Sequence, residues 1–449
     1  MNIRHFLLYS LVIVSILNGC SKKGGTDNPP GAAPGCTNNT SPANGAIVGS
    51  GPISLSWSPV SGATSYDIYF ITAISPGGVV VAANVTATNY TLTTLIFTGS
   101  NTFTWFVVPK NASGSATGCA SNASSFTLSN ISAPPPFGYY VVGYFPSYRN
   151  LADVPDVKFR MTNVVVYSFY SVNSTGGLSA PSAPAASLSA VTTKARANGA
   201  KVFLGINDGS GDGKTYFKNM ASTAAGRNTF IKAIMNTVRT NNLDGVDMDW
   251  EFPTTTDGTD LTFTELMKEL SDSLHQGARY YLSCAITAGK YAGGIRDAIR
   301  NELFPYVDFF NIMAYDDFNT TVPYRHHSDY ALAQTCLNYW LNTRSMPAAK
   351  CVLGVPAYGR PSGITQSGTV LTYKTILAQG GNPLYDSATV TAGAFTNYTI
   401  YYNGQYTVKR KAKLAKDIAN GVMFWEKWQD AADGNSLMKA ACDTVGRGY

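Results

Sequence analysis

The chain has 449 residues, which is too long for one ordinary domain and long enough for two. With 45% hydrophobic and only 13% charged residues, the composition excludes a largely disordered protein. The net charge of +6 is small for this length, and the densest basic run, Val408 to Lys416, is interpreted as a solvated helix face. No basic stripe interleaved with aromatic residues accompanies that run, so no nucleic-acid partner is expected.

Residues 1–20 are predicted to be a signal peptide rather than part of the fold. Their apolar run, residues 6–17, is too short to span a bilayer and ends just before Cys20. This ending resembles a bacterial lipobox, which implies that Cys20 is lipidated; an ordinary signal peptide cleaved nearby is the alternative. By the same resemblance, Ser21 fits sorting to the outer membrane of a Gram-negative cell. The Gly- and Pro-rich residues 21–35 are predicted to be a flexible tether, so we expect an exported protein, lipid-anchored or secreted, that contacts a membrane only through its anchor.

Residues 36–130 show the pattern of a small all-β sandwich. Short alternating runs are broken by Gly, Pro and Asn, and none of them predicts an amphipathic helix. Cys36 and Cys119 bracket the segment and are a candidate disulfide in an export pathway. The runs from Leu55 to Tyr69 and from Thr104 to Asn111 resemble fibronectin type III modules of secreted bacterial enzymes, which implies a spacer.

From residue 139 to 449 the pattern changes, after a Pro-rich linker at 131–138 that cannot join a sheet. Eight near-continuous apolar runs now alternate with amphipathic helical stretches. The runs are residues 140–145, 163–170, 201–207, 243–252, 280–287, 307–316, 350–359 and 421–426. Strands buried on both faces predict a closed parallel (β/α)8 TIM barrel, with a doubly wound open sheet as the alternative. The Gly-rich run at 209–213 is only a weak signal for a nucleotide loop, because a barrel loop needs the same flexibility.

The fourth of these strands carries three carboxyl groups at alternating positions. Asp247, Asp249 and Glu251 should point the same way, roughly 6–7 Å apart along the strand. Mutual repulsion and desolvation should raise the pKa of at least one of them and keep a proton available near neutral pH. Glu251 comes last, at the C-terminal mouth where barrel active sites lie, so it is predicted to be a general acid. An acidic strand end bound to helix N-termini or to a metal is the alternative, but no histidine or further acid cluster completes a metal site.

The run D-G-x-D-x-D-W-E, Asp244 to Glu251, resembles the signature of family 18 glycoside hydrolases, the chitinases and their relatives. Further matches follow in the right order along the barrel. They are Gly143-Tyr144-Phe145, Met313 to Asp316 in M-x-Y-D, Gly354 to Arg360 in G-x-P-x-Y-G-R, and Trp425 in F-W-E. The resemblance covers about 310 residues, the whole barrel, and five short motifs in sequence make it specific.

The resemblance implies a retaining mechanism in which the 2-acetamido group of the substrate is the nucleophile. Glu251 would protonate the glycosidic oxygen, Asp249 would hold the acetamide N–H, and Asp247 would share a proton with Asp249. Tyr315 would donate its hydroxyl to the acetamide oxygen. The same resemblance places Trp425 and Tyr144 around the reacting sugar and makes Asp316, Tyr358 and Arg360 sugar-binding residues.

One position departs from the family pattern. The third strand usually ends in S-x-G-G, but here the matching stretch is Gly205 to Asp208, so a serine that would contact the buried acids is missing. Asn207 is a candidate substitute, and the additional acid Asp208 is expected to shift the pH optimum.

The favoured function is cleavage of β-1,4-linked N-acetylglucosamine in chitin, by a monomeric enzyme without metal or cofactor. An endo-β-N-acetylglucosaminidase acting on N-glycans is the first alternative, because only about 60 residues separate Arg360 from the last strand, which is short for the insertion that walls deep-cleft chitinases. A catalytically inert sugar-binding lectin is the second alternative, although such relatives typically lose the acid that Glu251 supplies.

Overall fold

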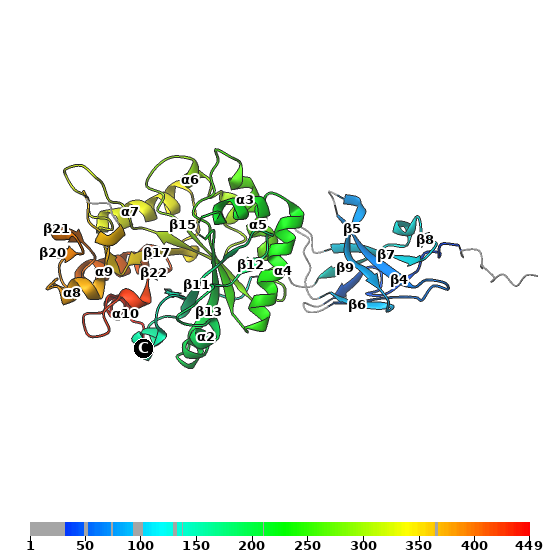
Figure 1. The fold of residues 1–449 in the computed structure, drawn as a ribbon, viewed down its shortest axis with the longest axis horizontal. Coiled ribbons are helices and arrows are strands. Elements are labelled where there is room, and N and C mark those ends of the chain that lie inside the picture. Colours follow the sequence, from blue (N-terminus) through cyan, green and yellow to red (C-terminus); the bar gives the residue numbers. More distant parts are fainter. Residues whose placement is uncertain are drawn as a thin grey trace, which may run out of the picture.

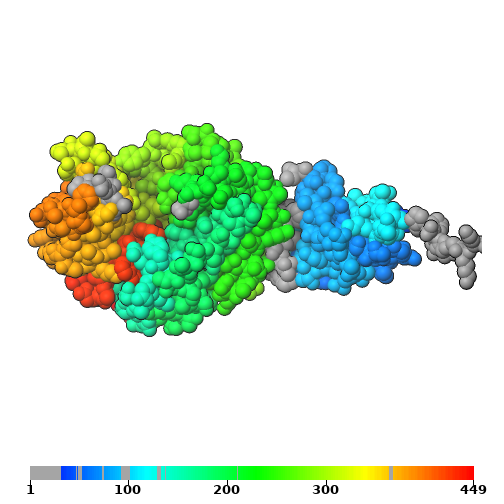
Figure 2. Space-filling model, in the orientation of Figure 1, coloured from blue at the N-terminus to red at the C-terminus, as the bar shows by residue number. Residues whose placement is uncertain are grey.

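In the computed structural model, the described residues are 32–48, 53–72, 75–92, 102–128, 133–136, 138–209, 211–363 and 367–449. The predicted signal peptide, Cys20 and most of the predicted tether lie outside them. Residues up to 128 gather at one end of the molecule, and the remainder forms a larger body (Figures 1 and 2). None of the described helices is long and apolar enough to cross a membrane.

The N-terminal region is all β, as predicted. One sheet has the order β1-β3-β6, and the other has the order β2-β9-β7-β4-β5, with β8 paired to β7. The strands are β1 (Asn39–Ser41), β2 (Ala46–Val48), β3 (Ile53–Trp57), β4 (Ser65–Thr72), β5 (Ser75–Val85), β6 (Asn89–Leu92), β7 (Thr102–Asn111), β8 (Gly114–Ser115) and β9 (Ser124–Leu128). Alternate residues of β3 and β4 are buried, so the two sheets share an apolar core built around Trp57, Tyr66 and Trp105.

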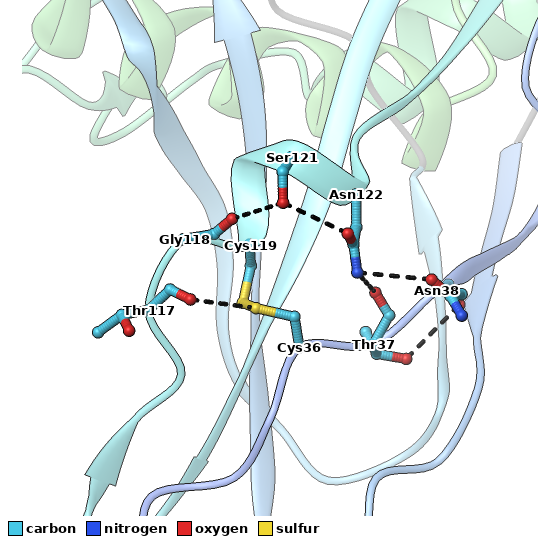
Figure 3. Close-up of a disulfide and its surroundings, with 8 residues drawn as sticks. All are labelled: Cys36, Thr37, Asn38, Thr117, Gly118, Cys119, Ser121 and Asn122. Atoms are coloured by element: carbon cyan, nitrogen blue, oxygen red, sulfur yellow. Dashed lines mark hydrogen bonds between the residues drawn. A yellow bond between two sulfur atoms is a disulfide. The ribbon is translucent and has the colours of Figure 1, made fainter.

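The predicted disulfide between Cys36 and Cys119 is present (Figure 3). It ties the segment before β1 to the short helical turn at Cys119–Asn122. In the same corner, the Asn122 side chain donates a hydrogen bond to the carbonyl of Thr37 over 3.0 Å. The closed loop spans 83 residues, so the disulfide joins the two ends of the N-terminal region.

The second region is a closed parallel barrel with helices around it, which confirms the predicted fold class (Figure 1). All eight predicted strands form, and pairing of the first with the second and the last closes the sheet. They are β10 (Tyr140–Pro146), β11 (Val164–Val172), β13 (Lys201–Asn207), β14 (Gly245–Asp249), β15 (Tyr281–Thr287), β16 (Phe309–Met313), β17 (Cys351–Pro356) and β22 (Gly421–Trp425). The two-residue strand β12 (Leu178–Ser179) extends β11 in the antiparallel direction.

Helices cover the outside of the barrel. The larger ones are α2 (Leu188–Ala197), α3 (Gly213–Ala221), α4 (Ala224–Thr240), α5 (Thr259–Leu274), α7 (Tyr330–Asn338), α9 (Gln405–Ile418) and α10 (Leu437–Val445), and the short ones are α1 (Asp156–Arg160), α6 (Gly294–Asp297) and α8 (Tyr373–Ala378). Val246, Met248 and Trp250 pack into this outer layer, whereas Tyr144, Phe203 and Met423 belong to a separate cluster inside the barrel.

One expectation about the basic run on α9 needs correction. Lys409, Lys413 and Lys416 are exposed as predicted, but Lys411 is fully buried. Its ammonium donates to the carbonyl of Ser328 over 2.7 Å and to the Asn403 side-chain oxygen over 2.7 Å. Burial lowers the pKa of Lys411 to about 7. A scan for net charge alone could not separate this inward lysine from its solvated neighbours.

Between β17 and α9 the chain forms a compact insertion. It contains the short pair β18 (Tyr358–Gly359) and β19 (Leu371–Thr372), helix α8, and the hairpin β20 (Ser387–Ala392) and β21 (Phe395–Tyr401). The backbone of Arg360 bonds with that of Tyr401 in both directions, at 2.9 and 3.2 Å, which ties the hairpin back to the barrel.

Candidate active site

The C-terminal ends of the barrel strands surround a cavity of about 630 Å³. Both carboxyl and aromatic side chains line it, which is the usual composition of a site for a polar ligand with apolar faces. The described lining residues include Tyr144, Tyr148, Phe169, Asn207, Asp249, Glu251, Phe252, Lys290, Tyr291, Met313, Tyr315, Asp316, Asp317, Tyr358 and Trp425. Most of the residues singled out from the sequence therefore meet at one place.

The row of three acids runs from the barrel interior to this cavity. Asp247 is fully buried and Asp249 is 4% exposed, whereas Glu251 is only partly buried and lies beyond the end of β14. Asp249 and Glu251 line the cavity, while Asp247 lies beneath it. The alternation of a strand thus gives the three carboxyl groups three different depths.

Asp247 is held by three donors from three different strands. The Tyr144 hydroxyl donates to it over 2.6 Å, the Ser283 hydroxyl over 2.5 Å, and the Asn311 side-chain amide over 3.0 Å. Burial raises the pKa of Asp247, and the three hydrogen bonds oppose that rise. Its charged form is therefore stabilised by donors rather than by a counter-ion.

Ser283 and Asn311 were not identified from the sequence. Each is a single polar residue inside an otherwise apolar strand, β15 and β16, and that interruption is the signal that could have found them. Ser283 pairs directly with Asp247 in the sheet register. It supplies from the fifth strand a hydroxyl like the one that the family pattern places on the third.

The third strand has no room for that serine. A Cβ atom at Gly205 would lie 2.8 Å from the Val166 side chain and 2.9 Å from the carbonyl oxygen of Tyr167. Asn207, the suggested substitute, lines the cavity, but its side-chain oxygen accepts from the N–H of Gly209 over 3.0 Å. The hydroxyl that contacts Asp247 therefore comes from Ser283, whereas the side-chain oxygen of Asn207 bonds within its own loop.

Asp249 is a buried acid with an oxygen atom that lacks a hydrogen-bond partner among the described residues. That atom is Oδ1, which is itself buried. Burial, followed by the charges of Glu251 and Asp247, raises the pKa of Asp249 well above its usual range. Asp249 nevertheless lines the cavity, so its carboxyl group lies within reach of a ligand.

Glu251 also titrates outside its ordinary range. Burial raises the pKa of Glu251, the charge of Asp208 adds to the rise, and the ammonium of Lys214 opposes it. That ammonium donates to the backbone carbonyl of Glu251 over 3.0 Å. A carboxyl with a raised pKa at the edge of a cavity has the properties of a general acid.

Aromatic rings form the floor of the cavity. Trp425 stacks on Phe169 with ring centroids 5.7 Å apart, and Tyr144 meets Trp425 edge-on at 5.4 Å. Among the described residues, the Tyr315 hydroxyl has one hydrogen-bond partner, the sulfur of Met423 at 3.9 Å, and burial raises the pKa of Tyr315 well above its usual range. Tyr315 is therefore a neutral hydrogen-bond donor at the cavity wall. Tyr144 lines the cavity beside Trp425, and its hydroxyl also donates to Asp247.

The three remaining candidates are bonded to one another. The Tyr358 hydroxyl donates to Asp316 over 2.6 Å, and Arg360 forms an ion pair with the same carboxylate at 3.1 Å. Burial alone would raise the pKa of Asp316, but His327, Tyr358 and Arg360 together lower it. Asp316 and Tyr358 line the cavity, but Arg360 does not. Arg360 therefore affects the cavity through its ion pair with Asp316.

The described residues contain no group of three or more His, Cys, Asp or Glu side chains arranged to hold a metal ion. Cys284, Cys336, Cys351 and Cys442 are buried and unpaired.

Comparison with known proteins adds independent information about this region. The sequence model of Glycosyl hydrolases family 18 matches residues 140–430. Chitotriosidase-1 of Mus musculus is 30% identical over 172 residues, which is 33% of this chain and 36% of that protein. Endochitinase 1 of Metarhizium robertsii is 27% identical over 269 residues, 52% of this chain and 62% of that protein. The chain therefore spans less than two thirds of the length of these relatives.

Solved structures share the barrel. The GH18 chitinase ChiB of Flavobacterium johnsoniae superimposes with a TM-score of 0.55 at 25% identity, covering 69% of this chain and 94% of that one. A GH18 chitinase of Cycas revoluta in complex with (GlcNAc)3 gives 0.58 at 23% identity, covering 68% of this chain and 99% of that one.

Proposed function

Because the chain belongs to family 18 of the glycosyl hydrolases, we propose that it hydrolyses β-1,4-linked N-acetylglucosamine chains, as found in chitin, with retention of configuration. One observation carries the proposal. Glu251 and Asp249 both line the cavity, and Asp247 is fully buried. Such a site offers one proton donor and one hydrogen-bond acceptor, and it leaves the nucleophile to the substrate.

In the first step, the carboxyl group of Glu251 gives its proton to the glycosidic oxygen, and the bond between that oxygen and the anomeric carbon breaks. The carbonyl oxygen of the 2-acetamido group bonds to the anomeric carbon from the opposite face, which gives a cyclic oxazolinium ion. In the second step, the Glu251 carboxylate takes a proton from a water molecule whose oxygen opens the ring. The acid is thereby restored.

Asp249 and Tyr315 would hold the acetamido group in position for this attack. The carboxyl group of Asp249 accepts a hydrogen bond from the acetamide N–H, and the Tyr315 hydroxyl donates one to the acetamide oxygen; both residues line the cavity. Correct placement of an internal nucleophile removes much of the entropic barrier to ring closure. Burial and the charge of Glu251 raise the pKa of Asp249, and the charge of Asp247, which is anchored by its three donors, raises it further.

The aromatic floor would bind the reacting sugar. The apolar face of the sugar ring packs on Trp425, and Tyr144 holds the edge of that indole while bonding to Asp247. Asp316 and Tyr358 would bind sugar hydroxyl groups, with Arg360 fixing the Asp316 carboxylate.

The N-glycan alternative is favoured by one feature of the insertion. Among its described residues, only Tyr358 lines the cavity, so the hairpin β20–β21 forms no wall there. A cavity open on that side admits branched as well as linear glycans.

The disulfide in the N-terminal region supports export to an oxidising compartment, in line with the proposed anchor at Cys20.

The test is to incubate the purified protein with chitin oligosaccharides and, separately, with a high-mannose glycoprotein. Release of chitobiose from the oligosaccharides is expected. Deglycosylation of the glycoprotein would instead support an endo-β-N-acetylglucosaminidase, and binding of oligosaccharides without any hydrolysis would support a lectin.

A further inference from the structure

The loop between β13 and α3 brings two opposite charges to the catalytic acid, and the family pattern requires neither. Asp208 follows the last residue of β13, and Lys214 lies in the first turn of α3. Asp208 is 4% exposed, and its Oδ2 atom is buried with no hydrogen-bond partner among the described residues. A buried carboxylate oxygen without a donor is costly to the fold, so its presence calls for a reason.

Glycine residues bend this loop back on itself. Gly209 and Gly211 have φ values of +70° and +61°, in the left-handed region that favours glycine. A Cβ atom at Gly213 would lie only 1.9 Å from the carbonyl oxygen of Asp208, so the start of α3 lies directly against Asp208. This fold carries Lys214 across to the end of β14, where its ammonium bonds to the backbone of Glu251.

Charged and titratable groups face Glu251 from three sides. Asp249 precedes it on its own strand, Asp316 and Tyr315 approach from the end of β16, and Asp208 and Lys214 approach from the β13–α3 loop. Of these groups Lys214 alone is positive; Lys290, which also lines the cavity, is paired with Asp317. After burial, the charge of Asp208 is the largest influence on the pKa of Glu251 and raises it, whereas Lys214 lowers it. Burial also raises the pKa of Asp208, and Lys214 again opposes the rise.

We propose that Asp208 and Lys214 are positioning residues that act on Glu251 as a pair of opposing charges and determine the pH up to which Glu251 keeps its catalytic proton. Lys214 holds the backbone of Glu251 in place, and Asp208 repels its anion. Asp208 stands where the family pattern usually has an uncharged glycine, and Lys214 follows it in the first turn of α3. The inference rests on the proposed role of Glu251 as the acid.

The experiment compares the pH profiles of kcat/KM on a chitin oligosaccharide for wild type, Asp208→Asn and Lys214→Met. Asp208→Asn removes a negative charge and should shift the alkaline limb of the profile to lower pH by about half a pH unit or more, because the Glu251 anion is no longer repelled. Lys214→Met removes a positive charge and should shift the alkaline limb to higher pH by a similar amount. The alkaline limb of the double variant should lie between the two. Lys218→Met is the matched control, since Lys218 lies on the same helix but pairs with Asp257.

A second readout does not depend on hydrolysis. In protein labelled with [13Cδ]glutamate, the Glu251 signal is identified by its loss in Glu251→Gln and is then titrated in each variant. If the wild type cleaves no N-acetylglucosamine substrate, the proposed function fails, and the titration still tests the pair. The inference is overturned if the Asp208 and Lys214 variants leave the Glu251 titration within about 0.2 pH unit of wild type, or shift it in the same direction. Should Asp208→Asn not fold, Lys214→Met alone decides through the sign of its shift.

Discussion

The N-terminal sheets bury an apolar interior and are tied by a disulfide, whereas the barrel encloses carboxyl groups and leaves four buried cysteines unpaired. A small β-structure has little core to stabilise it, and a covalent link between its ends compensates. The barrel has a far larger outer core and tolerates Asp247 and Asp249 in its centre. The active-site acids therefore lie in the region whose larger core can offset the free-energy cost of burying like charges.

The largest effect predicted from this comparison is at Asp249, one of the acids buried inside the barrel. Replacing it with asparagine should reduce kcat/KM on chitin oligosaccharides by roughly 10²–10³-fold, because the neutral amide cannot supply the negative charge that stabilises the positive charge of the developing oxazolinium ion. The same change should raise the Tm by about 2 °C or more at neutral pH. The folded-state pKa of Asp249 is raised, so its contribution to stability falls as pH rises from the ordinary carboxyl range toward that raised value, and the neutral amide removes this penalty.

Thermal unfolding should be measured from pH 4 to 8. The difference in Tm between Asp249→Asn and wild type should widen as the pH rises. Asp257→Asn is the control, because a hydrogen bond from Lys218 lowers the pKa of that exposed carboxyl to about 2, which predicts a small loss instead. A Tm of Asp249→Asn below that of wild type at every pH would contradict the idea that the buried acid destabilises the barrel.

The disulfide should matter only to its own region. The double change Cys36→Ser and Cys119→Ser should lower the free energy of unfolding of the N-terminal sheets by about 2–5 kcal/mol. Calorimetry should show the corresponding transition shifted, with the barrel transition and the rate of oligosaccharide hydrolysis unchanged. A reductant added to wild type should reproduce the effect, since the other described cysteines are already free. Loss of activity on reduction would show that the two regions are coupled.

The smallest expected effect is at Ser283. Its replacement by alanine removes one of three donors from Asp247, raises the pKa of that acid further and should lower kcat/KM by roughly 3–30-fold. Ser273→Ala is the matched control, because it also removes a buried hydroxyl group but lies on α5, where the hydroxyl bonds to the Glu269 carbonyl. Equal activity in the two variants would mean that Ser283 is only structural.

Much of the fold was predictable because it depends on periodic apolar patterns. All eight barrel strands form where apolar runs indicated them, and the N-terminal region is all β as its short alternating runs predicted. The outward direction of Val246, Met248 and Trp250 also followed from strand alternation. The disulfide was predictable from the position of the cysteines at the two ends of a β segment.

The site was predictable only in part. Asp249, Glu251, Tyr315 and Trp425 meet at one cavity as their motifs indicated. Ser283 and Asn311 were missed because their partner, Asp247, is distant in sequence and becomes a neighbour only when the strands are in register. The burial of Lys411 and the approach of Lys214 to Glu251 likewise depend on tertiary packing that no local pattern encodes.

The most direct test of the proposed chemistry is the rate at which wild type and Glu251→Gln release chitobiose from a saturating concentration of chitin hexasaccharide. The glutamine has nearly the same shape but no acidic proton, so oligosaccharide binding should persist while kcat falls by roughly 10²–10⁴-fold. A Glu251→Gln variant that works within a few-fold of wild type would show that another group supplies the proton and that the row of acids on β14 has a different purpose.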